Sequence, residues 1–308
     1  MVFKLFGNIN RVSLFEGCSE FALKSLIPIL SDLRNLKHIK LHLKFNTIKH
    51  HDMGLYYELF SKLKTIDIIG PWSYKSRFVP FSVINSDFTN LTNLTIISNK
   101  ILNNLSTHMP NLIQVKFLAY PVFEFDKAKL KSFFNINPQL RRLIVSDEIL
   151  NDEILKTIYS LKNLKYLEIS RARDAQIPQN LKGIINESIQ HIKICKYFQP
   201  GDLELFLNSC TNLKIVEIDN IQHFSDFEIN LTSNNSKDRL INLLILKRST
   251  WEFKSTLPNS ILKYFSRLKL MRWENASKFN RKTLRSLNNW EFMRDYASDA
   301  KEYCLIKK

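Results

Sequence analysis

The chain has 308 residues, of which 44% are hydrophobic and 24% are charged, and its net charge is +16. It has no apolar run near the ~18 residues that a membrane-spanning helix needs, and residues 1–7 are too short and too broken for a signal peptide. The four cysteines include no Cys-x-x-Cys pair. Composition therefore disfavours a membrane protein and a disulfide scaffold, and it predicts an intracellular protein, cytoplasmic or nuclear.

The positive charge is spread evenly along the chain. Basic residues outnumber acidic ones by 13 to 7 in residues 1–100, by 14 to 9 in 101–200 and by 18 to 13 in 201–308. A basic excess favours acidic partners or nucleic acid. Proteins that bind nucleic acid usually gather their charge on one face, however, so an even excess is more typical of a Lys-rich composition.

From the first line almost to the last, a phrase of the form Leu-x-x-Leu-x-Leu recurs about every 25 residues. Clear copies are Leu36-Lys-His-Ile39-Lys-Leu41 and Leu164-Lys-Tyr-Leu167-Glu-Ile169. All eleven copies begin at Ile9, Leu36, Leu63, Leu91, Leu112, Leu140, Leu164, Ile189, Leu213, Leu240 and Phe265. This period is typical of leucine-rich repeats, in which each repeat supplies one strand and a helix or 3₁₀ segment. The expected fold is an α/β leucine-rich-repeat solenoid, a horseshoe with a parallel sheet on its concave face and helices on its convex face.

Apolar residues at helical spacing place the predicted helices between the repeated phrases. In chain order they cover residues 20–33, interrupted at Pro28, then 53–63, 152–161 and 202–210. Segments 71–90 and 232–239 are predicted loops. We expect one domain, a solenoid of about eleven repeats over residues 1–280, followed by a helical cap over residues 281–308 that shields the core of the last repeat.

One departure from the regular repeat concerns the turn that follows each strand. Regular repeats place Asn or Cys there, and the side chain bonds to backbone groups of the turn. Eight residues after each start, only Asn99 fits this rule. The sequence therefore predicts a diverged family that has replaced or lost this ladder.

The third, fifth and seventh positions of each phrase should point outward from the sheet, away from the helices. In these rows, Ile69, Ile97, Leu118 and Ile144 form an apolar run, and Leu244 with Leu246 form a smaller one. Exposed apolar patches usually mark partner sites, although the inserted loops would cover these residues equally well. The predicted partner-binding residues are Lys40, Ile69, Ile97, Lys116, Leu118, Ile144, Tyr166, Glu168, Lys193, Glu217, Leu244 and Leu246.

A second candidate is a basic segment, residues 263–285, in which aromatic residues are interleaved. Such a segment could grip a phosphate backbone and stack bases. Aromatic residues at repeat spacing more often belong to the core, so a solvated face of the last repeat explains the pattern as well. The candidate anion-binding residues are Lys263, Arg267, Lys269, Arg272, Arg281 and Lys282.

The sequence contains no pattern that points to catalysis. It lacks Gly-rich phosphate loops, His-x-x-x-His and Cys-x-x-Cys ligand spacings, and a nucleophile elbow. The adjacent pair His50-His51 would point in different directions. We therefore expect no enzyme, no cofactor and no metal site.

The repeat length, the helical returns and the phrase Cys210-Thr-Asn-Leu213 resemble the leucine-rich repeats of F-box proteins. In that family, an N-terminal F-box docks on the Skp-type adaptor of a cullin ubiquitin ligase, and the repeats capture the protein substrate. The resemblance implies that the outward rows recognise a substrate. No F-box phrase precedes the first repeat, so an adaptor is expected as a partner only if an F-box lies upstream.

Three functions are thus consistent with the sequence. The favoured one is a non-enzymatic protein-binding solenoid that recognises the substrate of a cullin-type ligase. The alternatives are nucleic-acid binding through residues 263–285 and a regulatory scaffold, such as an activator of a GTPase.

Overall fold

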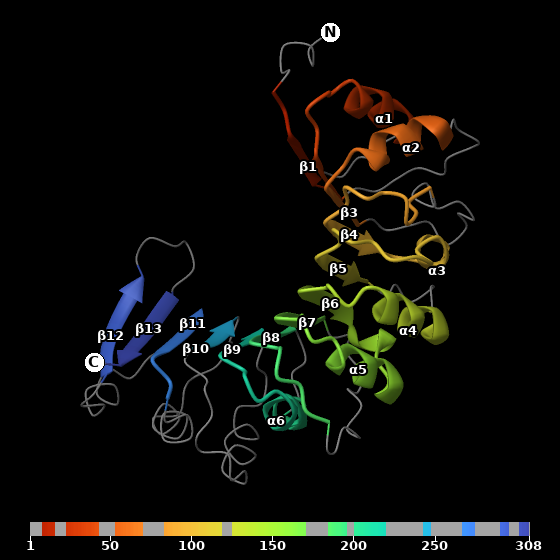
Figure 1. Cartoon of the computed structure of the whole chain (residues 1–308). Coiled ribbons are helices and arrows are strands. Elements are labelled where there is room, and N and C mark those ends of the chain that lie inside the picture. The colour runs from red at the N-terminus through yellow and green to blue at the C-terminus, as the bar shows by residue number, and fades with distance from the viewer. Residues whose placement is uncertain are drawn as a thin grey trace. The chain divides into compact units, whose positions relative to one another are not determined.

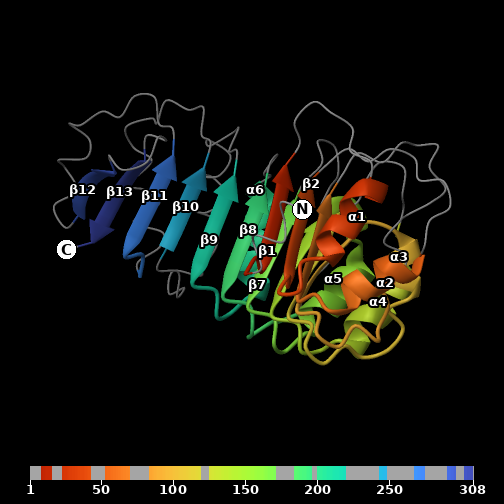
Figure 2. The ribbon, with the colours of Figure 1, turned by 90° about the horizontal axis from the view of Figure 1, so that it is seen from above.

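In the computed structural model, residues 8–15, 23–42, 53–69, 83–118, 125–170, 184–195, 200–219, 243–247, 267–274, 290–295 and 302–307 are described. The chain divides into two compact units, Met1–Leu143 and Ile144–Lys308. The main part of each unit is a set of parallel strands that lie side by side in chain order (Figures 1 and 2). This architecture, together with the repeated phrase, is that of an α/β leucine-rich-repeat solenoid, which confirms the predicted fold class.

The N-terminal unit contains strands β1 (Arg11–Phe15), β2 (His38–His42), β3 (Thr65–Ile69), β4 (Asn93–Ile96) and β5 (Gln114–Phe117). Its helices α1 (Leu23–Ser31), α2 (Met53–Ser61), α3 (Asn99–Asn103) and α4 (Lys127–Ile136) all lie on one side of these strands (Figure 2). Strand β6 (Arg142–Ser146) begins at the end of this unit. Helix α1 accommodates Pro28, where the sequence predicted an interruption.

The C-terminal unit contains the 3₁₀ turn η2 (Asp147–Ile149), helix α5 (Asp152–Tyr159), strands β7 (Tyr166–Ser170) and β8 (His191–Cys195), and helix α6 (Pro200–Ser209). Strands β9 (Ile215–Asp219), β10 (Leu243–Lys247) and β11 (Leu270–Glu274) continue the parallel sheet. Strands β12 (Trp290–Asp295) and β13 (Glu302–Lys307) follow. Helix α5 is capped at its start: the Asn151 side chain accepts a hydrogen bond from the amide of Ile154 at 2.8 Å, and such caps stabilise helices.

The strand register confirms the frame of the early repeats. Val12 pairs with Ile39, Ile39 with Ile66 and Ile66 with Leu94, so the fourth position of each phrase faces the fourth position of the next. The amides of the second and third positions donate to the carbonyl of the second position one repeat earlier: those of Lys64 and Thr65 lie 2.7 and 3.1 Å from Lys37 O. This contact recurs because the same backbone geometry is repeated in each turn of the solenoid.

The predicted frame is wrong in the last two repeats. Val216 pairs with Leu244, and Leu244 pairs with Met271, so these phrases start at Ile241 and Leu268 and not at Leu240 and Phe265. Apolar residues are nearly continuous at 240–246 and at 268–271, so the phrase fits more than one frame there. The sequence pattern alone could not choose between them.

The core lies between the strands and the helices and consists of the repeated aliphatic residues. Ile39, Leu41, Leu167 and Ile169 have no exposed surface. Phe117 adds ring contacts with Phe133 and Phe134 of α4, both at centroid distances of 5.4 Å. Burial of such side chains contributes roughly 1.5–3 kcal/mol each, so the helices are held by the sheet and not by their own propensity.

The described part of residues 281–308 differs from the predicted helical cap. It forms the strands β12 and β13, which pair antiparallel, and β13 pairs antiparallel with β11. The amide of Lys307 donates to the carbonyl of Lys269 at 2.9 Å, which is the position that a next repeat would fill. A strand therefore continues the ladder at this end of the sheet, and residues 281–289 of the predicted helical cap lie outside the described residues.

Candidate partner-binding surface

The side of each sheet that faces away from the helices is here called the strand face, and it carries the third, fifth and seventh positions of the repeats. Of the predicted partner-binding residues, Lys40, Ile69, Lys116, Leu118, Tyr166, Glu168 and Lys193 lie on it and are half-buried, and Glu217 lies on it and is buried. Side chains on neighbouring strands lie ~5 Å apart and shield one another. The face is therefore a closely packed layer in both units.

The predicted apolar run is not exposed. Ile97 retains only 2% of its surface, because β4 ends at Ile96 and the chain turns inward toward α3. Ile144 is 7% exposed, as expected for a side chain within a packed row. Leu244 is fully buried, because its register places it opposite Val216 in the core, and Leu246 pairs with the buried Ile218. Ile97, Ile144 and Leu244 therefore belong to the core or to covered positions, whereas Ile69 and Leu118 are half-buried on the strand face, so the predicted apolar run is not continuous.

A polar network occupies the strand face of the N-terminal unit. Asp67 on β3 accepts a hydrogen bond from the Thr95 hydroxyl at 2.7 Å and one from Lys116 Nζ at 2.8 Å. His42 Nε2 lies 3.8 Å from the same carboxylate. Burial alone would raise the pKa of Asp67, but the hydrogen bonds from Lys116 and Thr95 outweigh it and hold that pKa below its ordinary value. The carboxylate is therefore ionised and fixed in place.

A second network occupies the strand face of the C-terminal unit. Glu168 on β7 accepts hydrogen bonds from the Tyr166 hydroxyl at 2.5 Å, from Lys193 Nζ at 3.1 Å and from Cys195 Sγ at 3.4 Å. Lys193 also lies 3.9 Å from Glu217. Burial opposes ionisation of Glu168, yet its three donors hold its pKa below the ordinary value. The network joins three neighbouring strands.

The Cys195 thiol is not a reactive nucleophile. Burial and the neighbouring Glu168 raise its pKa to about 12, so it stays protonated at neutral pH, and only the thiolate is nucleophilic. Cys195, Cys210 and Cys304 are free thiols. In the residues that the structure describes, no group of three or more His, Cys, Asp or Glu side chains could hold a metal ion.

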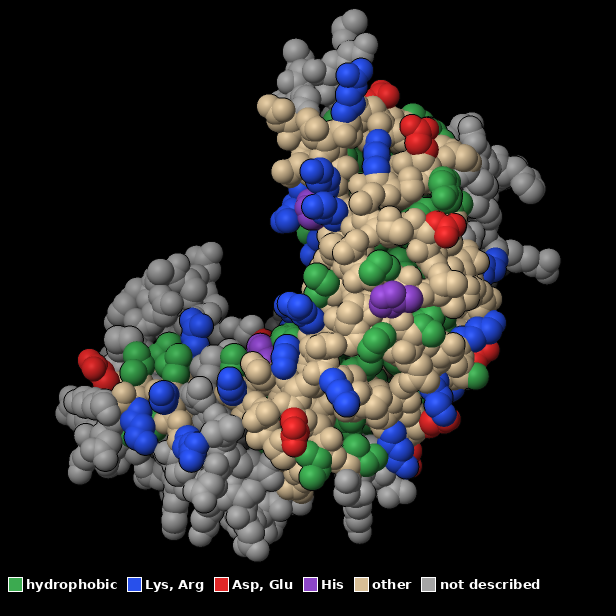
Figure 3. Space-filling model, in the orientation of Figure 1, with side chains coloured by type: hydrophobic (Ala, Val, Ile, Leu, Met, Phe, Trp, Pro, Cys, Tyr) green, Lys and Arg blue, Asp and Glu red, His purple; other side chains and the backbone are tan. Residues whose placement is uncertain are grey.

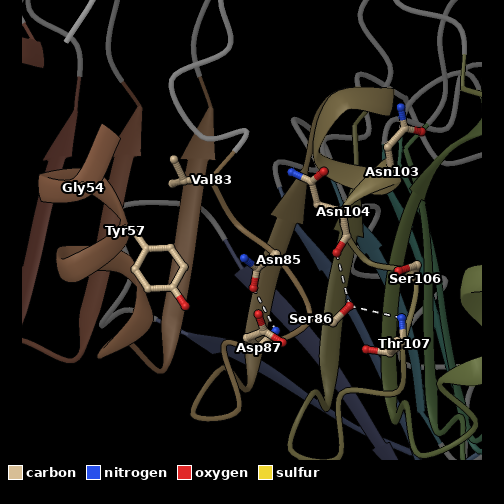
Figure 4. A pocket seen from close by; sticks show the side chains of 10 residues that line it. All are labelled: Gly54, Tyr57, Val83, Asn85, Ser86, Asp87, Asn103, Asn104, Ser106 and Thr107. Atoms are coloured by element: carbon tan, nitrogen blue, oxygen red, sulfur yellow. Dashed lines mark hydrogen bonds between the residues drawn. The ribbon is translucent and has the colours of Figure 1, made fainter. Parts of the chain in front are cut away.

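One hollow lies away from the strand face, beside α2 and α3 of the N-terminal unit (Figure 4). It has a volume of about 730 Å³ and is lined by polar residues and Tyr57. Its polar groups bond to one another: the Ser86 hydroxyl donates to Asn104 O, and Asn85 accepts from the amide of Asp87. These contacts stabilise a loop and do not align a nucleophile with a base.

The basic segment falls largely outside the described residues. Lys263, Arg281 and Lys282 lie outside them. Arg267 and Lys269 are exposed just before β11, and Arg272 is half-buried on that strand. The structure therefore brings together only part of the predicted anion-binding set.

Two buried side-chain amides that sequence reasoning missed, Asn137 and Asn186, lie at the turns before the phrases at Leu140 and Ile189. The buried Asn137 side chain accepts from the amide of Met109 at 3.0 Å and donates to Phe133 O at 2.9 Å. Asn186 donates to Tyr159 O and accepts from the amide of Ile189. Both stand three residues before a repeat start, which is the signal that could have found them. The post-strand Asn99 also bonds across repeats, since it accepts from the amide of Asp126 at 2.9 Å.

Comparisons with known proteins add little to this description. No protein-family model matches the chain, and no curated protein matches it either. Among solved structures, an internalin from Listeria monocytogenes is similar over 87% of this chain and 67% of its own, with 16% sequence identity and a TM-score of 0.45. No helix in the described ranges is long and apolar enough to cross a membrane.

Proposed function

We propose that this chain is a non-enzymatic binding solenoid that recognises a protein partner with its strand face. The observation that carries the proposal is the pair of hydrogen-bonded networks around Asp67 and Glu168, each fixed across three strands. Side chains that are ordered before binding lose little conformational entropy when a partner docks. Such a face offers oriented hydrogen-bond donors and acceptors, and the aliphatic parts of its long side chains, to a protein surface.

The C-terminal unit provides the most favourable anchor. The ring of Tyr166 lies edge-on against His191, at a centroid distance of 4.6 Å, and its hydroxyl is held by Glu168. Aromatic residues with a fixed orientation are enriched among the residues that dominate binding energy. Leu118, half-buried after β5, would be the apolar contact in the N-terminal unit.

The experiment recovers partners with the tagged chain, purifies them and measures their affinity for variants. Tyr166→Ala and Leu118→Asp should each weaken binding by more than ~1 kcal/mol if they contact the partner. Tyr57→Ala and Lys156→Glu, which change exposed residues of α2 and α5, serve as matched controls on the helix side. Equal affinities for all four variants would reject the strand face as the site.

By resemblance, we propose that the recognised partner is the substrate of a cullin-type ubiquitin ligase. What supports this is the phrase at residues 210–213, in which Cys210 is buried and Asn212 donates to Glu187 O at 2.6 Å. The phrase thus lies at a turn that bonds to the preceding repeat. Copurification of the native protein with a Skp-type adaptor tests the role, and its absence would leave a binding solenoid outside that ligase class.

Intracellular location is part of the same proposal. Nucleic-acid binding through residues 263–285 and a regulatory scaffold remain the alternatives, and no contact in the described residues favours either of them.

A further inference from the structure

Exposed cations lie at the starts of β1 to β3, where Arg11 begins β1 and Lys37 and Lys64 directly precede β2 and β3. The backbones of Lys37 and Lys64 are in contact, since the Lys64 amide donates to Lys37 O at 2.7 Å. All three positive charges lower the pKa of His38, together with burial, which is the largest cause. In the part of the chain that the structure describes, their side chains make no hydrogen bond or ion pair. Figure 3 shows Lys and Arg side chains gathered with a histidine on the surface over β1 to β3.

On strands β1 to β3 of this unit, the carboxylate of Asp67 is already engaged. Both oxygens of Asp67 accept hydrogen bonds, one from Thr95 and one from Lys116. Among the described residues, Asp67 therefore offsets the charge of Lys116 and makes no ion pair with Arg11, Lys37, Lys40 or Lys64. An uncompensated group of like charges raises the free energy of the unbound protein and favours an anionic partner.

An exposed aromatic ring lies at the other end of β1, beside a fourth cation, Lys40. Phe15 at the end of β1 is 60% exposed, Lys40 Nζ stands 5.2 Å from the centre of its ring, and His42 meets its edge. A large exposed apolar group next to cations fits a segment that carries both acidic and apolar side chains. Because Lys40 already covers one side of the ring, Phe15 is poorly placed to stack on a nucleic-acid base.

We propose that Arg11, Lys37, Lys40 and Lys64, with Phe15, form a docking site for an acidic segment of a partner protein. This inference rests on the proposed protein-binding function and names the chemistry of its partner. Carboxylates of the segment pair with the cations at the starts of β1 to β3, and an apolar side chain packs on Phe15.

The test measures binding of a fluorescent peptide rich in Glu and Leu, of about ten residues, which at ~3.3 Å per residue spans these strands. The competing probes are a charge-reversed peptide, with Lys in place of Glu, and a single-stranded RNA oligonucleotide. The full chain should bind the acidic peptide in a salt-dependent manner. The double variant K37E/K64E should lose at least about tenfold in affinity, and F15A should lose part of it. K156E, on α5, should bind as the unaltered chain does.

Failure of the acidic peptide to bind, or equal binding by K37E/K64E, would overturn the inference. Tighter binding of the RNA would overturn it as well. The outcomes are separable from those of the proposed function: a natural partner that needs Tyr166 and Leu118 but tolerates K37E/K64E would keep the binding solenoid and reject the acidic segment. Circular dichroism of K37E/K64E confirms that both exposed substitutions leave the fold intact.

Discussion

Lys116 on β5 lies 2.8 Å from the carboxylate of Asp67 on β3, two strands away on the same face of the sheet. The pair reaches across β4, whose Thr95 bonds to the other oxygen of the carboxylate. A contact over 49 residues thus joins three repeats through one carboxylate. Repeats in a solenoid otherwise contact only their neighbours. This pair therefore couples three repeats on the strand face, as the aliphatic residues couple neighbouring repeats in the core.

Removal of this carboxylate should destabilise the N-terminal unit. Asp67→Asn should lower the free energy of unfolding by about 1.5–3 kcal/mol, since it weakens two hydrogen bonds of which one is to a charged group. A double-mutant cycle with Lys116→Met, followed by urea denaturation, measures the coupling. The exposed pair Asp126–Lys129, at 3.9 Å, is the control, and its coupling should stay below ~0.5 kcal/mol. Similar coupling in both pairs would contradict the description of Asp67.

The buried Asn137 should matter as much as a core residue. Asn137→Ala would leave the amide of Met109 without its side-chain acceptor, which costs about 1–3 kcal/mol in a buried site. Thermal unfolding of Asn137→Ala checks this. Asn111→Ala, which removes an exposed bond to Thr89 O, should change stability by less than ~0.5 kcal/mol. If the two variants had the same stability, the structural role assigned to the Asn137 amide would be contradicted.

The free energy of unfolding should decrease as the pH decreases, because of the two histidines of β2. Burial is the largest cause of the lowered pKa of both His38 and His42. The unfolded chain, with the ordinary value of 6.5, binds protons more readily than the folded one, so the free energy of unfolding decreases as the pH falls below that value. Urea denaturation between neutral pH and mildly acidic pH should show a shallower decrease for the His38→Gln variant. An unchanged slope would show that His38 titrates alike in both states.

The corrected register predicts which apolar residues support the fold. Leu244→Ala and Ile97→Ala remove buried side chains and should each cost about 2–5 kcal/mol. Leu118→Ala, at a half-buried position of the strand face, should cost clearly less. Comparison of urea midpoints decides the matter. If Leu244→Ala left the midpoint unchanged, the frame in which Leu244 points outward would be restored.

Much of the fold could be predicted from the sequence because the repeated phrase marks the residues that pack in the core. The starts at Leu36, Leu63 and Leu164 each place an aliphatic residue at the same point of the ladder, and the helix at 152–161 follows from its apolar spacing. The predicted start of the repeat is wrong at Leu240, because nearly every residue there is apolar and alternation carries no information. The end of the chain was misread because helical spacing and strand spacing cannot be separated over so few apolar residues.

The candidate surface was only partly readable. Asp67, Thr95 and Lys116 stand next to one another in the fifth-position row, so their proximity follows from the period, but their mutual hydrogen bonds depend on side-chain rotamers. Ile97 was placed outward because the sequence does not show that β4 ends one residue earlier. The cations near His38 were not predicted as a group, because Lys37 and Lys64 occupy the second position of the phrase. That position lies before the strand and outside the third, fifth and seventh positions.

The most direct test of the central claim is site-specific photo-crosslinking to a purified partner. A photoreactive residue would replace Gln114 or Tyr166 on the strand face, or Tyr57 or Lys156 on the helix side. The account predicts that the partner is crosslinked from the strand-face positions and not from the helix-side positions. Crosslinking from Tyr57 and Lys156, with none from Gln114 and Tyr166, would show that the partner binds to the helices and would contradict the assignment of the strand face.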